Sequence, residues 1–128
     1  MQPSPMFLET LKQGIKKQID VGAIAANELK SYTRETSPLK EIYRTYGYCN
    51  IISVTNMALA INLMLELDGT RSRSQLIPGG AVITLSAVQF TEFTLTNLTA
   101  NVSLGGEVYV TVGFEPPVAP GITIGGLK

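Results

Sequence analysis

The sequence predicts a mainly β protein: a small antiparallel β-sandwich or barrel with an N-terminal helix and an extended C-terminal arm. Three observations support this fold class. Apolar residues recur at helical spacing over residues 4–30, they alternate with polar residues from residue 48 onward, and prolines and glycines dominate the end of the sequence. A chain of 128 residues can form one modest domain with appendages. We therefore divide it into residues 1–47, 48–114 and 115–128.

Residues 4–30 are predicted to form an amphipathic helix. Ser4 can cap its N-terminus, and Pro5 occupies the first helical position, where a missing N–H costs nothing. Apolar or small residues then form one stripe with spacings of three and four: Leu8, Leu11, Ile15, Ile19, Gly22, Ala26 and Leu29. Because the second half of the stripe is built of small residues, another backbone can approach it closely. A break is predicted at Pro38, followed by a short second helical turn.

From Tyr48 the apolar period changes to two, as in strands with one buried face. The clearest alternation covers residues 57–67 and predicts six inward side chains: Met57, Leu59, Ile61, Leu63, Leu65 and Leu67. Further β-rich segments follow at residues 81–90, 91–99 and 106–114. Gly and Pro mark the turns between them, at Asp68-Gly69, Pro78-Gly79-Gly80 and Gly105-Gly106. Five or more short strands without helical patterns between them predict an antiparallel sandwich or small barrel.

Residues 115–128 are predicted to form the extended arm. Pro116, Pro117 and Pro120 prevent ordinary pairing within the centre of a sheet. The following "GITIGG" contains Ile122 and Ile124, which favour a strand conformation. This segment could add to a sheet edge of its own subunit or of a neighbour.

Composition limits the classes of partner. The formal net charge is zero, so neither nucleic acid nor an acidic membrane surface is expected as a partner. Only 16% of residues are charged and 45% are hydrophobic, which favours burial of surface against copies of the chain or another protein. The single cysteine, Cys49, excludes an intrachain disulfide and favours a reducing compartment. The N-terminus lacks the pattern of a secretion signal, and no apolar run is long enough to predict a membrane span.

The residues that usually carry catalysis are scarce. The sequence contains no histidine, which excludes Ser-His-Asp and Cys-His systems and leaves no zinc-type ligand set. Glycine motifs for nucleotides are also absent. We therefore predict no enzymatic activity, cofactor, metal or small-molecule substrate. Glu66 and Asp68 are two residues apart, so we expect them on one face of a strand end, and we interpret them as solvated.

The stretch "LELDGTRSRSQLIPGG" is interpreted as two strand ends joined by a polar connection. Arg71 and Arg73 lie on this connection, and we expect an ion pair across a subunit contact. Too few basic and aromatic residues surround them for a nucleic-acid site. Tyr43, Tyr46 and Tyr48 are predicted to join the N-terminal part to the sandwich.

The order of segments within residues 48–114 has a recognisable form. A strand ends in "SVTN", an alternating strand ends in "LELDG", a polar loop leads to "LIPGGAVITL", and "FTEFTLTNLT" and "VYVTVGF" follow. This order resembles that of small β-sandwich structural proteins of tailed-bacteriophage virions, in which an I-P-G turn opens a strand. The resemblance implies a non-enzymatic virion protein, made in the host cytoplasm, that decorates the head or forms part of the neck, tail or baseplate.

This hypothesis implies self-association, as a trimer or another ring, and contacts with other virion proteins. The predicted subunit contacts are Leu8, Leu11, Ile15, Ile19, Arg71, Arg73, Ile122 and Ile124. Two alternatives stay open. The sandwich could be a carbohydrate- or receptor-binding module of a fibre, or, as the least favoured alternative, a small hydrolase that uses Glu66 and Asp68.

Overall fold

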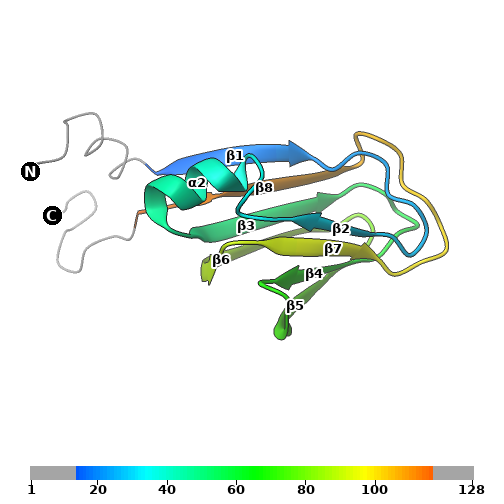
Figure 1. Ribbon diagram of the computed structural model, residues 1–128. Coiled ribbons are helices and arrows are strands. Elements are labelled where there is room, and N and C mark those ends of the chain that lie inside the picture. The colour runs from blue at the N-terminus through cyan, green and yellow to red at the C-terminus, as the bar shows by residue number, and fades with distance from the viewer. Residues whose placement is uncertain (1–13, 117–128) are drawn as a thin grey trace, which may run out of the picture.

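Two antiparallel sheets and one short helix make up the part of the chain that the structure describes. The computed structural model describes residues 14–116, apart from the side chains of residues 70–72. The elements are β1 (Ile15–Asp20), β2 (Leu29–Tyr32), α2 (Leu39–Tyr46), β3 (Cys49–Asn56), β4 (Leu63–Leu67), β5 (Thr70–Ile77), β6 (Val82–Phe90), β7 (Phe93–Asn97) and β8 (Val108–Phe114). The first sheet has the order β1-β8-β3-β6 and the second the order β2-β7-β4-β5 (Figure 1). The predicted mainly β class is therefore confirmed.

The two sheets share one apolar core. The inward side chains come from every second position of the central strands, as the alternation in the sequence predicts. Val54 of β3, for example, lies between Val110 of β8 and Ile83 of β6. The fully buried aliphatic and aromatic side chains of the central strands are Ile52, Val54, Leu63, Leu65, Leu67, Phe93, Leu95, Val108, Val110 and Val112. Each buried side chain of this size contributes roughly 1.5–3 kcal/mol.

Helix α2 covers one end of this core. It follows Pro38 and is capped after Tyr46 by Gly47, which is left-handed and whose N–H donates to the Tyr43 carbonyl at 2.8 Å. The helix buries Leu39 and Ile42. Tyr46 stacks on Phe114 of β8 with ring centroids 4.3 Å apart, and Tyr48 packs against the same ring. The short helix after Pro38 is thus confirmed, and two of the three tyrosines join it to β8 as predicted.

The helix predicted over residues 4–30 is wrong where the structure describes it. Residues 15–20 form β1, the edge strand next to β8. Residues 29–32 form β2, the edge strand next to β7. Ile15 and Ile19 are four residues apart, a spacing that places both on one face of a helix and equally on one face of a strand. Positive φ angles at Gly22 and Asn27 then turn the chain from one sheet to the other. Residues 1–13, including Leu8 and Leu11, lie outside the described residues.

Two predicted strand boundaries also need correction. β4 covers only Leu63–Leu67, and residues 57–62 form a loop in which Met57 and Leu59 are exposed instead of inward. The supposed polar connection after Asp68 is strand β5, which forms a hairpin with β4. Asp68 and Gly69 both have positive φ, as a tight hairpin turn requires. Residues 117–128, with the predicted arm and its Ile122 and Ile124, lie outside the described residues.

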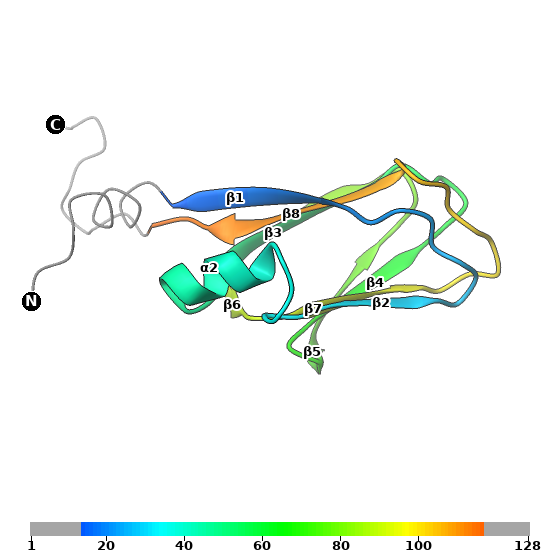
Figure 2. The same cartoon turned by 45° about the horizontal axis from the view of Figure 1, so that its top comes forward.

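The body has two distinct ends, which Figure 1 and Figure 2 show from two sides. β1 begins and β8 ends beside α2, and Gly14 lies against Phe114 and Pro116. At the opposite end, loops 57–62 and 98–107 lie side by side, because Met57 N–H donates to the Glu107 carbonyl at 2.8 Å and Leu98 N–H to the Asn62 carbonyl at 2.9 Å. We call the surface formed by these two loops the loop end.

Candidate functional site

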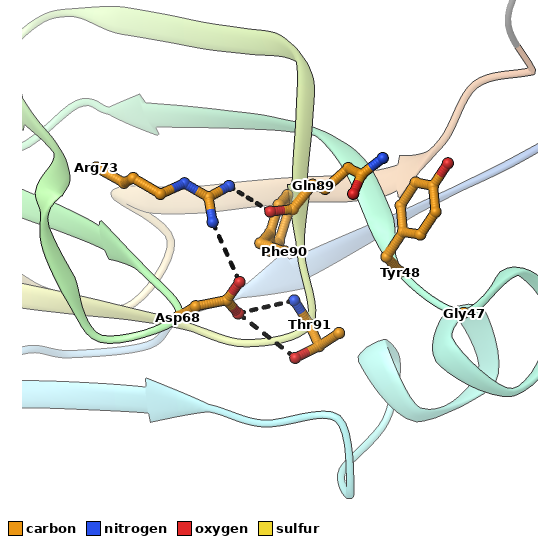
Figure 3. A pocket seen from close by; sticks show the side chains of 7 residues that line it. All are labelled: Gly47, Tyr48, Asp68, Arg73, Gln89, Phe90 and Thr91. Carbon is orange, nitrogen blue, oxygen red and sulfur yellow. Dashed lines mark hydrogen bonds and ion pairs between the residues drawn. The ribbon is translucent and has the colours of Figure 1, made fainter.

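A polar depression lies beside α2, where two connections and a hairpin meet. It has a volume of about 500 Å³ and is lined by Gly47, Tyr48, Asp68, Arg73, Gln89, Phe90 and Thr91 (Figure 3). These residues come from the α2–β3 connection, the β4–β5 hairpin, the end of β6 and the connection that follows β6. Asp68 and Arg73 are the charged residues among them, so any chemistry in the depression depends on these two side chains.

The Asp68 carboxylate accepts hydrogen bonds from the main chain of the connection between β6 and β7. Its Oδ1 accepts hydrogen bonds from the N–H groups of Thr91 at 2.9 Å and Glu92 at 3.1 Å. The Asp68 N–H donates in turn to the Glu92 carbonyl at 2.9 Å. Asp68 therefore fastens the β4–β5 turn to the connection that leaves β6 of the first sheet and enters β7 of the second, which is a structural role.

Arg73 completes this cluster from β5. One of its guanidinium nitrogens lies 3.2 Å from Asp68 Oδ2, and the other donates to the Gln89 carbonyl. Both side chains are about one-third exposed, so the ion pair contributes only about 0–1 kcal/mol. The ion pair that the sequence predicts across a subunit contact thus forms within the chain in the case of Arg73. The side chain of Arg71 lies outside the described residues.

Glu66 and Asp68 do not form a carboxylate pair. The positive φ of Asp68 turns it out of the strand, so the expectation that both face the same way is wrong. Glu66 lines a separate depression of about 370 Å³ with Met64, Ser74, Thr96 and Leu98, on the outer face of the second sheet. Within residues 14–116, no three acidic or cysteine side chains come together as a metal-binding group.

Cys49 is a buried side chain of the core. Burial, together with the nearby negative charge of Asp68, raises the pKa of its thiol to about 12. The thiol is therefore protonated at neutral pH, and a protonated thiol is neither a good nucleophile nor a metal ligand.

Among the described residues, a group of exposed apolar side chains lies on the two loops of the loop end. Between 48% and 80% of each of these five side chains is exposed: Met57, Leu59, Leu98, Val102 and Leu104. A depression of about 290 Å³ runs between the two loops and is lined by Met57, Ala58, Leu59, Ala60, Ile61, Val102 and Glu107. Exposed apolar surface of this kind is typical of a protein contact. The predicted alternation concealed it, because it placed Met57 and Leu59 inward.

Two buried asparagines hold the loop end in shape. Asn56, at the end of β3, accepts from Ala58 N–H and donates to the carbonyls of Ile61 and Ile77. Asn97, at the end of β7, accepts from Thr99 and donates to the carbonyls of Ala25 and Asn101. Neither asparagine is exposed to solvent. The exposed apolar side chains therefore project from loops that hydrogen bonds hold in one conformation.

The predicted helical contact residues occupy different places. Ile19 is buried in the core of its own chain, and Ile15 is partly buried and packs against that core. Both therefore stabilise the body itself. No protein-family model and no curated protein matches the chain. Among the described residues, no helix has the length and apolar character that crossing a membrane requires.

Proposed function

We propose that this protein is a non-enzymatic β-sandwich structural subunit of a tailed-phage virion, and that it associates with copies of itself and with other virion proteins. The apolar loop end is the observation that carries this proposal. Leu59 and Leu104 project from it with 80% and 68% of their surfaces exposed. Burying two such side chains contributes roughly 3–6 kcal/mol in total, which favours a contact between subunits.

The arrangement of the two ends suits a repeating assembly. The loop end lies opposite Gly14 and Pro116, where the described part of the chain begins and ends (Figure 2). A contact between unlike ends of neighbouring copies forms a ring when its rotation closes. The order of strands and turns that resembles small virion proteins supports the same function, as decoration of the head or as a component of the neck, tail or baseplate.

Light scattering over a range of protein concentrations tests self-association. We expect the full chain to form an oligomer, and the Leu59→Ser, Leu104→Ser double variant to shift it towards monomer. Tyr43→Ser is the control, because Tyr43 is 37% exposed but lies on α2, at the opposite end of the body. A monomer at every concentration would contradict the proposal, as would unchanged assembly of the double variant.

Two further measurements separate the parts of the proposal. Deleting residues 117–128 should leave the circular dichroism spectrum of the body intact and impair assembly. An antibody raised against the chain should label virus particles released from cells that make it. Labelling of cell debris alone would argue against the virion and leave self-association standing.

A further inference from the structure

The four edge strands of the two sheets differ in their protection. β1 carries Lys16, Lys17 and Asp20, β2 is short and carries Lys30, and β5 carries Arg71 and Arg73. β6, by contrast, has nine residues with neither a charge nor a proline. Charges, prolines and short strands are the usual features that prevent an edge from pairing with another chain. The one bulge in β6 lies near its end, where Ala87 has a φ of 58°.

The open side of β6 can be assigned to particular main-chain groups. Asn56 N–H donates to the Ala81 carbonyl at 2.9 Å, and the β3–β6 register continues from Thr55–Val82 to Ile51–Ser86. Hydrogen-bonded and non-hydrogen-bonded pairs alternate along an antiparallel ladder. Ile83 and Leu85 therefore direct their main-chain groups towards β3. The main-chain N–H and C=O groups of Val82, Thr84 and Ser86 point to the opposite, open side of β6.

The side chains along this edge specify what could pair with it. Ile83 and Leu85 face inward and are only partly buried beside the core. Thr84 faces outward, where its hydroxyl lies 2.9 Å from that of Ser53. A matching strand would carry two apolar side chains over Ile83 and Leu85, with a hydroxyl between them beside Thr84. The sequence Ile122-Thr123-Ile124 has this pattern and, like β6, lacks charge.

We infer that the open edge of β6 binds residues 121–125 of a second copy of this chain as an added strand. This inference rests on the proposed self-association. The described chain ends at Pro116, which lines a depression of about 300 Å³ with Ser86 and Ala87 of β6. To pair with β6 of its own subunit, the chain would have to reverse its direction directly after Pro116. Pro116, Pro117 and Pro120 favour a stiff, extended spacer, which directs the segment towards a neighbour.

Cross-linking between full-length variants tests this pairing. Thr84→Cys and Thr123→Cys variants of different tag length are mixed under mild oxidation. The expected product is a disulfide-linked heterodimer that forms in the mixture at least about tenfold faster than either variant links to itself. Native Cys49 is buried and does not compete. If the Thr84→Cys, Thr123→Cys double variant cross-links only within one chain, the segment pairs with its own edge and the inference is wrong. If an assembled mixture of the two single variants forms no cross-link, the segment does not pair with β6 at all.

A second pair of variants tests the main-chain contribution. Thr84→Pro removes an N–H on the open side, at an edge position where proline is tolerated. Thr84→Ala is the control, since it removes the hydroxyl but keeps the N–H. We expect light scattering to show at least about tenfold weaker assembly for Thr84→Pro than for Thr84→Ala. If the parent assembles and Thr84→Pro assembles equally well, only this inference fails. A monomeric parent would instead defeat the proposed function, and if Thr84→Pro does not fold, the cross-linking result decides.

Discussion

The side-chain amide of Asn50 binds the main chain of Glu115 on both its donor and its acceptor side. Asn50 Nδ2 donates to the Glu115 carbonyl at 2.8 Å, and Asn50 Oδ1 accepts from the Glu115 N–H at 2.7 Å. The β3–β8 register ends one position earlier, with Ile51 opposite Gly113. The amide therefore continues the ladder beyond the last pair of residues. It fixes the direction in which the chain leaves the body towards Pro116.

Replacing Asn50 by Ala should loosen this exit. The variant loses two hydrogen bonds, each with a net contribution of about 0.5–1.5 kcal/mol, so we expect a destabilisation of about 1–3 kcal/mol. Urea unfolding measures it as a lower midpoint with an unchanged slope. Asn101→Ala is the comparison, because the Asn101 amide makes a single bond, to the Ala60 carbonyl. Equal stability of Asn50→Ala and the parent would show that the Asn50 bonds contribute nothing.

Asp68 allows its two roles to be separated. Asp68→Asn keeps an oxygen that can accept from Thr91 and Glu92, and loses mainly the charge that faces Arg73. We expect it to cost at most about 1 kcal/mol. Asp68→Ala removes the acceptor as well and should cost about 1.5–3 kcal/mol. Thermal unfolding of both variants measures the difference, and equal losses would mean that the ion pair dominates.

Most strands could be predicted because one of their faces is buried. In β4 and β8, every second residue enters the core, so the pattern from Leu63 to Leu67 and from Val108 to Val112 is visible in the sequence. β1 was missed because Ile15 and Ile19 satisfy both the helical and the strand period. Its charged residues, typical of a protected edge, were interpreted as the polar face of a helix.

The sites were harder to predict, because they depend on contacts between distant residues. Met57 and Leu59 continue the alternation of β4, but the Asn56 side chain binds Ala58 and Ile61 and turns the chain away. The Asp68–Arg73 pair spans a single hairpin turn, so the Asp-Gly signal could have located it. No local pattern indicated that Thr91 would bind the same carboxylate, since it lies 23 positions later.

Cys49 should be almost unreactive in the folded protein. Burial raises the pKa of its thiol from 9.0 to about 12, which at pH 8 leaves about a thousandfold less thiolate. We expect a thiol reagent to modify the native protein at least about 100-fold more slowly than the urea-unfolded protein. The rate should rise with pH between 8 and 11. Fast modification at pH 8, comparable to that of the exposed cysteine in Thr84→Cys, would contradict the burial of Cys49.

The same pKa shift predicts a loss of stability at high pH. Because the folded state raises the pKa of Cys49, its contribution is complete below pH 9 and is lost as the pH rises through about 12. Burial also raises the pKa of Tyr32, which acts in the same direction. Cys49→Val lacks the thiol and should therefore lose less stability between pH 8 and pH 11 than the parent. Parallel pH profiles, measured by urea unfolding, would count against ionisation of Cys49 as a cause.

Glycines at two close contacts should not tolerate even one methyl group. A Cβ on Gly79 would meet the carbonyl oxygen of Leu59, and one on Gly113 would meet that of Ile15 in the neighbouring β1. Neither obstacle is a flexible side chain, so the backbone itself would have to move. Gly105→Ala is the matched control, because a Cβ there meets nothing within 4 Å and Gly105 does not need a positive φ.

We therefore expect Gly79→Ala and Gly113→Ala each to cost about 1–3 kcal/mol, and Gly105→Ala to change little. Gly113→Ala should also separate β1 from β8, because the clash lies between these two strands. Amide hydrogen exchange detects this as faster exchange in residues 15–20 at unchanged protection of β3. If Gly113→Ala leaves the exchange of β1 unchanged, the close approach of the two strands is not required for their pairing.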